Sequence, residues 1–237
     1  MKKLFVFVFT LLFTLAFTSM NFFNSANAEE NNTTNYQELQ KDGTLDKSVT
    51  QEQWNQFLQN SSQAKQQIEN KSDVSTRSRF HLKAGDVLIS NATSSWGLTG
   101  HAAIAISSKK ILHIYGKGHH PATHSLSWFK KRYAKKGKWM KIYRSKKHGA
   151  GSKAARWARK HYVGKKYRYG INTHLSKRNP TYCSKIVYQA YRYGIGRKAM
   201  SSPTPIVSPY TLPNFSSNSY KLKRVKRSEE HTSELQS

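Results

Sequence analysis

The chain has 237 residues and a strongly uneven charge, with 40 Lys and Arg against 12 Asp and Glu. Residues 80–226 contain 31 of these bases and a single acid, Asp86. That count excludes glycoside hydrolysis by paired carboxylates in this segment, and it also excludes carboxylate-ligated magnesium or calcium sites. Catalysis within residues 80–226 therefore has to use His, Cys, Ser, Tyr or backbone groups.

The first 28 residues have the three parts of a secretory signal peptide. A charged start, MKK, precedes an apolar run, and Ala-Asn-Ala at residues 26–28 matches a small-residue cleavage site. A membrane anchor is the alternative, but the apolar run is short for a transmembrane span. We predict cleavage after residue 28 and a secreted, extracellular protein that is associated with the cell envelope.

Residues 29–79 predict a flexible leader that carries one helix. The part up to residue 47 is rich in Asn, Thr, Gln and Glu, a composition typical of flexible segments. Thr50 and Gln53 form a capping box at the start of a helix over residues 49–70. Because the apolar stripe of this helix is only partial, we expect a weakly docked appendage, followed by a polar linker.

Residues 80–226 predict one compact domain in which strands and helices interleave without a βαβ rhythm. Strands are expected at residues 86–90, 101–107, 111–115 and 139–144, with an edge strand at 220–225. Helices are expected at residues 127–136, 152–163 and 182–193, with Ser127 and Ser152 as the first two N-caps. We therefore predict an α+β domain with a small antiparallel sheet or partial barrel packed against helices.

Residues 227–237 read RSEEHTSELQS, which is the translation of a widely used sequencing-library adapter. We interpret this segment as a sequencing-adapter artefact and exclude it from the fold prediction, as for any cloning scar. A natural acidic tail is the alternative interpretation.

The chain has one cysteine, Cys183. A single thiol in an exported chain has no internal disulfide partner, so Cys183 is a partner for another chain, a reactive group or a buried apolar filler. Its predicted position at a helix N-terminus, in a cationic domain, favours the thiolate and predicts a lowered pKa. We predict that Cys183 is a nucleophile and that nearby backbone N–H groups hold an oxyanion.

Two histidines lie on apolar strands, unlike the others. His101 opens HAAIAIS directly after Gly100, and His113 lies within ILHIY. An antiparallel hairpin would place the two rings side by side, so that one acts as general base while the other fixes its tautomer. The alternative is that each is an ordinary core histidine with its hydrogen bonds satisfied.

The segments GDVL, GHAAIAIS and KKILHIYG resemble the His half of the NlpC-type cysteine peptidases. The segments VGKKYRYG and TYCSKIVYQAY resemble their Cys half. Here the His half comes first and VSPYTL follows the Cys helix, an order similar to the circularly permuted YiiX-like branch and to lecithin:retinol acyltransferase-like proteins. The resemblance covers residues 82–222 and implies a permuted papain-like fold.

The resemblance also implies roles for four residues: Cys183 as nucleophile, His101 as general base, His113 as third polar residue, and Tyr167 lining the oxyanion side of the pocket. YiiX-like members often carry a carboxylate in the third place, where this chain has His113. The alternatives for that place are His119 and His120.

We predict a secreted cysteine hydrolase that cleaves an amide or ester bond at the cell envelope through an acyl-thioester. A peptidoglycan peptide is the first substrate to test, by analogy of fold. The alternative within the fold is a lipid or N-acyl amino acid amidase or acyltransferase. The alternative from another class is a non-catalytic, polyanion-binding cell-wall protein, because the bases are interleaved with aromatic residues at positions 128–139.

No cofactor or metal is expected, although His119, His120 and His124 form an alternative zinc ligand set. The basic face is expected to bind an anionic wall polymer or a membrane surface, and any binding of nucleic acid would be non-specific. We expect a monomer.

Overall fold

The computed structural model describes residues 35–71, 80–92 and 100–229. The chain divides into two compact units, residues 1–42 and residues 43–237. In the first unit, residues 35–41 form a helix that the Asp42 N–H closes by donating to the Glu38 carbonyl over 2.9 Å. This helix lies within the stretch that the composition predicted to be flexible. The predicted signal peptide lies outside the described residues.

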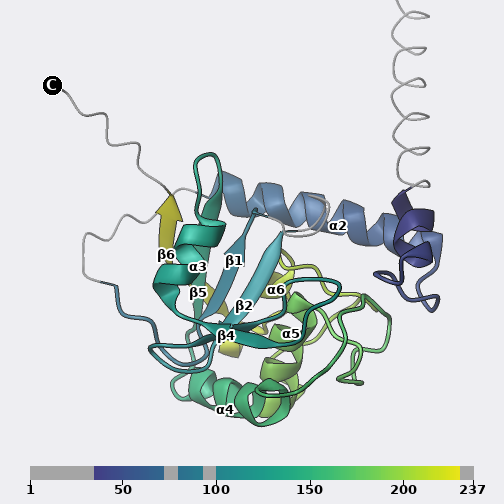
Figure 1. The fold of residues 1–237 in the computed structure, drawn as a ribbon. Helices are drawn as coiled ribbons and strands as arrows, with labels where there is room; N and C mark the ends of the chain where they lie inside the picture. The colour runs from purple at the N-terminus through teal and green to yellow at the C-terminus, as the bar shows by residue number, and fades with distance from the viewer. Residues whose placement is uncertain (1–34, 72–79, 93–99, 230–237) are drawn as a thin grey trace, which may run out of the picture. The chain divides into compact units, whose positions relative to one another are not determined.

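The second unit is built on a six-stranded antiparallel sheet with the order β4-β3-β2-β1-β5-β6 (Figure 1). Each neighbouring pair of strands is antiparallel. The strands are β1 (Val87–Ser90), β2 (His101–Ala105), β3 (Ile111–His113), β4 (Ala122–His124), β5 (Trp139–Ser145) and β6 (Leu222–Glu229). The predicted α+β class with an antiparallel sheet is therefore confirmed. The short strand β4 was not predicted.

Each face of the sheet packs against its own helices, because side chains alternate along a strand. On β2, Ala102 and Ile104 belong to the core shared with α4 (Ala150–Tyr162) and α5 (Cys183–Gly194). Ala103 and Ala105 belong to a second core on the opposite face, shared with α3 (Leu126–Tyr133) (Figure 1). The sheet is thus buried on both sides in its centre.

Helix α2 (Gln51–Asn70) forms part of the first core, so the expectation of a weakly docked appendage is wrong. Its capping box at Thr50 and Gln53 is confirmed. The stripe looked partial because it includes small and polar residues. The buried residues of α2 are Trp54, Phe57, Ser61, Ala64 and Ile68.

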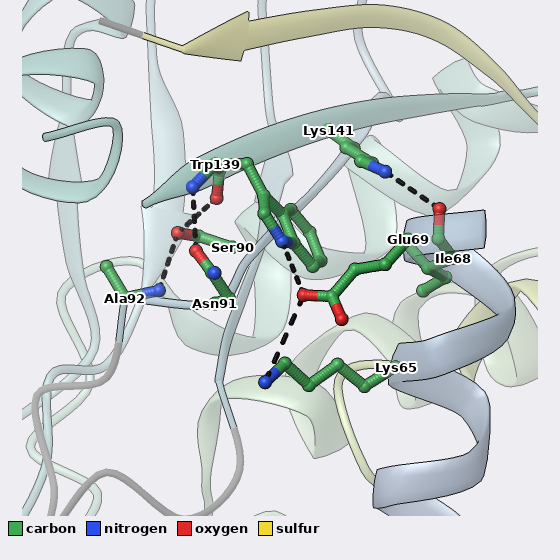
Figure 2. Close-up of polar contacts among 8 residues, drawn as sticks. All are labelled: Lys65, Ile68, Glu69, Ser90, Asn91, Ala92, Trp139 and Lys141. Carbon is green, nitrogen blue, oxygen red and sulfur yellow. Dashed lines mark hydrogen bonds and ion pairs between the residues drawn. The ribbon is translucent and has the colours of Figure 1, made fainter. Parts of the chain in front are cut away.

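Two polar contacts fasten the C-terminal end of α2 to β5 (Figure 2). The Trp139 indole N–H donates to the Glu69 carboxylate over 2.9 Å, and the buried Lys141 ammonium donates to the Ile68 carbonyl over 2.7 Å. A cation at a helix C-terminus satisfies a carbonyl that lacks an intrahelical partner and complements the helix dipole.

Three helix starts differ from the prediction or refine it. Ser125, not Ser127, caps α3 by accepting the Trp128 N–H over 3.2 Å. Gly149 precedes α4 with a φ of 73°, so that helix begins two residues before Ser152. The remaining helix, α5, begins at Cys183 with Tyr182 as N-cap, as predicted within one residue.

Strand β6 is longer than the predicted edge strand and extends to Glu229, into the segment interpreted as an adapter artefact. It pairs with β5 from residue 222 to residue 229, with one register shift between Ile142 and Tyr143 of β5. A backbone ladder uses N–H and C=O groups that every non-proline residue carries, so an edge strand can recruit residues of almost any sequence.

Among the described residues, no helix is long and apolar enough to cross a membrane.

Candidate active site

The two strand histidines meet at one end of the sheet. His101 begins β2 and His113 ends β3, and the His101 Nε2 lies 3.0 Å from the His113 Nδ1. The predicted pairing of the two rings is confirmed by this hydrogen bond. It leaves the His101 Nδ1 as the nitrogen available to a reacting group.

Gly100 sets the start of β2 and hence the position of His101. Its φ is 69°, a left-handed conformation that favours glycine. A Cβ at this position would overlap the Tyr210 hydroxyl and would lie 2.6 Å from the Ser90 carbonyl oxygen. Ser90 is also the β1 partner of His101 in the sheet register. The chain therefore has to enter β2 through a residue without a side chain.

The two rings are enclosed by aromatic side chains from α3. Tyr133 stacks on His101 with 4.5 Å between ring centroids and 4° between planes, and Phe129 packs edge-on against His113 at 5.0 Å. Burial lowers the pKa of His101 to about 3 and that of His113 to about 2. The positive charge of Arg132 acts in the same direction on both rings. Both rings are therefore neutral at physiological pH.

The hydrogen bond between two neutral rings has a direction that matters for catalysis. If the His101 Nε2 carries the proton, it donates to the His113 Nδ1, and the His113 proton then lies on Nε2. This arrangement leaves the His101 Nδ1 unprotonated and able to accept a proton. The His113 Nε2 is buried and has no hydrogen-bond partner among the described residues, so either tautomer leaves that nitrogen unpaired.

Cys183 lies at the N-terminus of α5 and is 8 % exposed. Burial raises the pKa of the Cys183 thiol. Hydrogen bonding from the backbone N–H of Ala102 lowers this pKa, and the Ser184 hydroxyl and N–H lower it by smaller amounts. The effect of burial outweighs these hydrogen bonds. The prediction of a lowered thiol pKa is therefore wrong in direction. Helix-end N–H groups surround the sulfur as expected, but the loss of hydration is the larger effect.

The sulfur and the histidine pair lie at the same end of β2. The Ala102 N–H that acts on the thiol belongs to the residue that follows His101, and Ala102 and Cys183 share one core. Tyr133, which stacks on His101, has its pKa raised chiefly by burial and in part by the charge of Cys183. The start of β2 thus has Cys183 on its α5 side and the His101–Tyr133 stack on its α3 side.

A protein-family model matches residues 55–228, most of the chain, and its family is described as lipoprotein N-acylation protein LnsA-like. The chain belongs to this LnsA-like family. The family consists of papain-like cysteine hydrolases and acyltransferases related to YiiX-like and lecithin:retinol acyltransferase-like proteins, so the broad resemblance is confirmed. The circular permutation stays a prediction.

One curated relative is an uncharacterized 30.3 kDa protein of Bacillus thuringiensis, 42% identical over 156 residues. The aligned part is 62% of this chain and 58% of that protein, so the chain spans less than two thirds of the relative's length. No solved structure matches the chain.

Tyr167, the fourth residue to which the NlpC-type resemblance gave a role, is half-buried against the core that contains Cys183. Its ring packs edge-on against Tyr162 at 5.7 Å, and its carbonyl oxygen accepts from the His120 Nδ1 over 3.0 Å. Neither of these contacts is to Cys183, His101 or the other histidine of the pair. An oxyanion role for Tyr167 stays a prediction.

The three histidines of the alternative zinc set have separate partners. His119 packs on the Tyr115 ring, His120 bonds the Tyr167 carbonyl, and the His124 Nε2 lies 3.0 Å from the Tyr115 hydroxyl. In the part of the chain that the structure describes, no three His, Cys, Asp or Glu side chains converge as metal ligands. The alternative zinc set is therefore not assembled.

A buried lysine supports the start of α5. The Lys185 ammonium donates to the Asn172 side-chain oxygen and to the Pro180 carbonyl, each over 2.9 Å. Burial lowers the pKa of Lys185 to about 7. These bonds tie the loop that precedes Cys183 to the first turn of the helix. They help to fix the position of the sulfur.

Sequence reasoning missed two residues of the site. Tyr133 and Tyr210 come from separate elements, and each has its pKa raised mainly by burial and partly by Cys183. The Tyr133 carbonyl accepts from the Ser90 hydroxyl over 2.7 Å, which links α3 to β1. Tyr210 lies within VSPYTL, a segment that the sequence analysis used only for its place after the Cys helix, and no motif surrounds Tyr133.

Proposed function

We propose that this LnsA-like protein takes an acyl group from a lipid ester onto Cys183 as a thioester and passes it to an amine, with water as an alternative acceptor. The observation that carries the proposal is the Cys183 helix start at the same end of β2 as the His101–His113 pair, in a chain of this family. The family's description as lipoprotein N-acylation favours acyl transfer over cleavage of a peptidoglycan peptide.

In the first step, the His101 Nδ1 takes the proton of the Cys183 thiol as the sulfur attacks the ester carbonyl. A C–S bond forms and the carbonyl π electrons move to the oxygen, which the α5 N-terminal N–H groups stabilise. The tetrahedral intermediate then breaks its C–O bond. The leaving alkoxide takes the proton from the imidazolium of His101, so the alcohol leaves and the thioester remains.

His113 supports this step without touching the substrate. When His101 becomes an imidazolium, its Nε2–H donates to the His113 Nδ1, which stabilises the charge and keeps Nδ1 of His101 directed at the reaction. Both resting groups are neutral, since burial raises the pKa of Cys183 and lowers that of His101. Proton transfer therefore accompanies attack rather than preceding it.

In the second step, the acceptor amine attacks the thioester carbonyl, and His101 removes a proton from the amine. The C–S bond breaks, the thiolate regains a proton from His101, and an amide is released. With water as acceptor, the same steps give a free acid. The aromatic and aliphatic lining around Cys183 and His101 favours the amine, because it limits access of water.

Export and surface binding complete the proposal. Residues 1–28 direct secretion, and the bases of residues 80–226 hold the protein on an anionic membrane surface or wall polymer. Retention on anionic vesicles is then expected to fall steeply between low and moderate salt, while turnover of a small soluble ester changes less. Retention that does not respond to salt contradicts this part of the proposal.

The test is to trap the acyl-enzyme. Purified protein is incubated with isotope-labelled lipid esters and, in parallel, with purified wall peptides, and the mass of the Cys183 peptide is measured. We expect the acyl mass from lipid esters, its loss in Cys183→Ser, and its discharge by an added amine. Cleavage of wall peptides without an acyl adduct from any lipid would instead support the amidase that the sequence predicted.

A further inference from the structure

The guanidinium of Arg132 lies on a platform of three aromatic rings beside the histidine pair. Its Cζ is 5.2 Å from the ring centroid of Tyr115 and 6.0 Å from those of Trp128 and Tyr133. The His124 ring stacks on the Trp128 ring of this platform, with 3.9 Å between the two ring centroids. Cation–π contacts with several rings hold the group in place although the residue is exposed.

Among the described residues, no carboxylate forms an ion pair with Arg132. The single acid of residues 80–226 is Asp86, and the Arg144 guanidinium already donates to it from Nε over 2.6 Å and from Nη2 over 2.7 Å. A guanidinium is a planar fork of N–H donors that matches the oxygens of a phosphate or carboxylate. The Arg132 side chain also interacts with the Tyr133 hydroxyl, which acts to lower the pKa of that tyrosine, and the other N–H donors of this exposed fork can meet an external anion.

The platform is continuous with the reacting groups. Tyr133 stacks on His101, and Tyr115 packs on His113 with 4.5 Å between ring centroids. The charge of Arg132 is felt at both histidines and contributes to the low pKa of each. An anion bound to Arg132 lies on the α3 side of the site, next to the base rather than on a distant surface.

We propose that Arg132 binds the phosphate of a phosphate-bearing acyl donor and thereby selects the substrate of Cys183. This assignment rests on the proposed function, because it concerns the donor of the same acyl transfer. In an esterified membrane lipid, the phosphate is the anionic group closest to the ester carbonyls. A fixed guanidinium beside His101 positions one such carbonyl toward the sulfur and gives neutral esters no equivalent contact.

The test compares binding of two short-chain donors that differ in the phosphate. Full-length Cys183→Ala protein is titrated calorimetrically with dihexanoyl phosphatidic acid and with dihexanoylglycerol. Arg132→Gln is expected to weaken binding of the phosphate-bearing donor by about tenfold or more, since charge-assisted hydrogen bonds are lost, and to leave the neutral donor unchanged. Arg132→Lys, which keeps the charge but not the fork, is expected to give an intermediate loss.

Lys131→Gln is the matched control, because Lys131 is an exposed base on the same helix. It is expected to change binding of either donor less than twofold. Equal losses in Lys131→Gln and Arg132→Gln would mean a diffuse electrostatic effect and would overturn the assignment. Equal binding of the two donors by the Cys183→Ala protein would overturn it as well.

Turnover by protein with Cys183 intact separates this inference from the proposed function. If Arg132→Gln removes the preference for the phosphate-bearing donor in binding, but neither donor acylates Cys183, the anion site stands and the acyl transfer fails. If both donors acylate Cys183 and Arg132→Gln alters neither reaction nor binding, the acyl transfer stands and the anion site fails.

Discussion

The buried histidine pair predicts that this protein loses stability as the pH falls from neutral. Burial lowers the pKa of His101 from 6.5 to about 3 and that of His113 from 6.5 to about 2. The unfolded chain binds protons at these residues below pH 6.5, whereas the folded chain stays neutral there until the pH approaches 3. Stability is therefore full above pH 6.5 and is lost progressively as the pH falls through this window.

The size of the effect follows from the same values. At pH 5 an unfolded histidine lies 1.5 pH units below its pKa of about 6.5, so one histidine that stays neutral in the folded state costs about 2 kcal/mol. The two rings share a hydrogen bond and do not titrate independently. The expected loss between pH 7 and pH 5 is thus between about 2 and about 4 kcal/mol for the pair.

The assay is urea unfolding at pH 7 and pH 5. The double variant His101→Gln with His113→Gln should lose less stability on acidification than the unmodified protein, by the amount given above. His148→Gln, which removes an exposed histidine, serves as the control. If the double variant does not fold, NMR titration of the two imidazoles in the unmodified protein replaces it. The reasoning is refuted if the double variant keeps the full pH dependence, or if either ring titrates near pH 6.5.

Three further predictions concern the site. Because burial raises the pKa of Cys183, its alkylation by iodoacetamide should be slower than that of a free thiol at pH 7 and should still be rising above pH 8.5; a plateau below pH 7 would contradict this. His101→Ala should abolish acyl transfer, as Cys183→Ala does. His113→Gln should retain a measurable fraction of the acyl-transfer activity, because the base survives without its orienting partner. Full activity in folded His101→Ala protein would disprove the mechanism. Gly100→Ala should lower the free energy of unfolding, measured by chemical denaturation, by more than about 1 kcal/mol. Alanine is strained at a φ of 69°, and its Cβ would overlap Tyr210. An unchanged denaturation midpoint would show that the turn can relax.

Several site features could be read from local sequence because they depend on short-range geometry. A Gly-His step at the start of an apolar strand and a second His on the next strand placed the His101–His113 pair correctly, since a hairpin brings such residues together. The position of Cys183 at a helix start followed in the same way from the local pattern.

The misjudged helix α2 depends on contacts that no local pattern contains. Its stripe includes Ser61 and Ala64, which look weak alone but are buried in the folded unit. Its C-terminal end is held by Trp139 and Lys141, about seventy residues further along the chain. Propensity and periodicity describe one segment at a time, so they could not assign these partners.

The sequence by itself determined the chemistry that this protein can perform, because composition limits residue types wherever the chain folds. One acid in residues 80–226 excluded carboxylate mechanisms, and one cysteine with two strand histidines indicated the candidate reacting groups. Only the tertiary structure decided their protonation. At Cys183, burial outweighs the hydrogen bonds at the helix start, whereas at His101 burial and the charge of Arg132 act in the same direction. Removing water from a charged group is the largest effect at both residues.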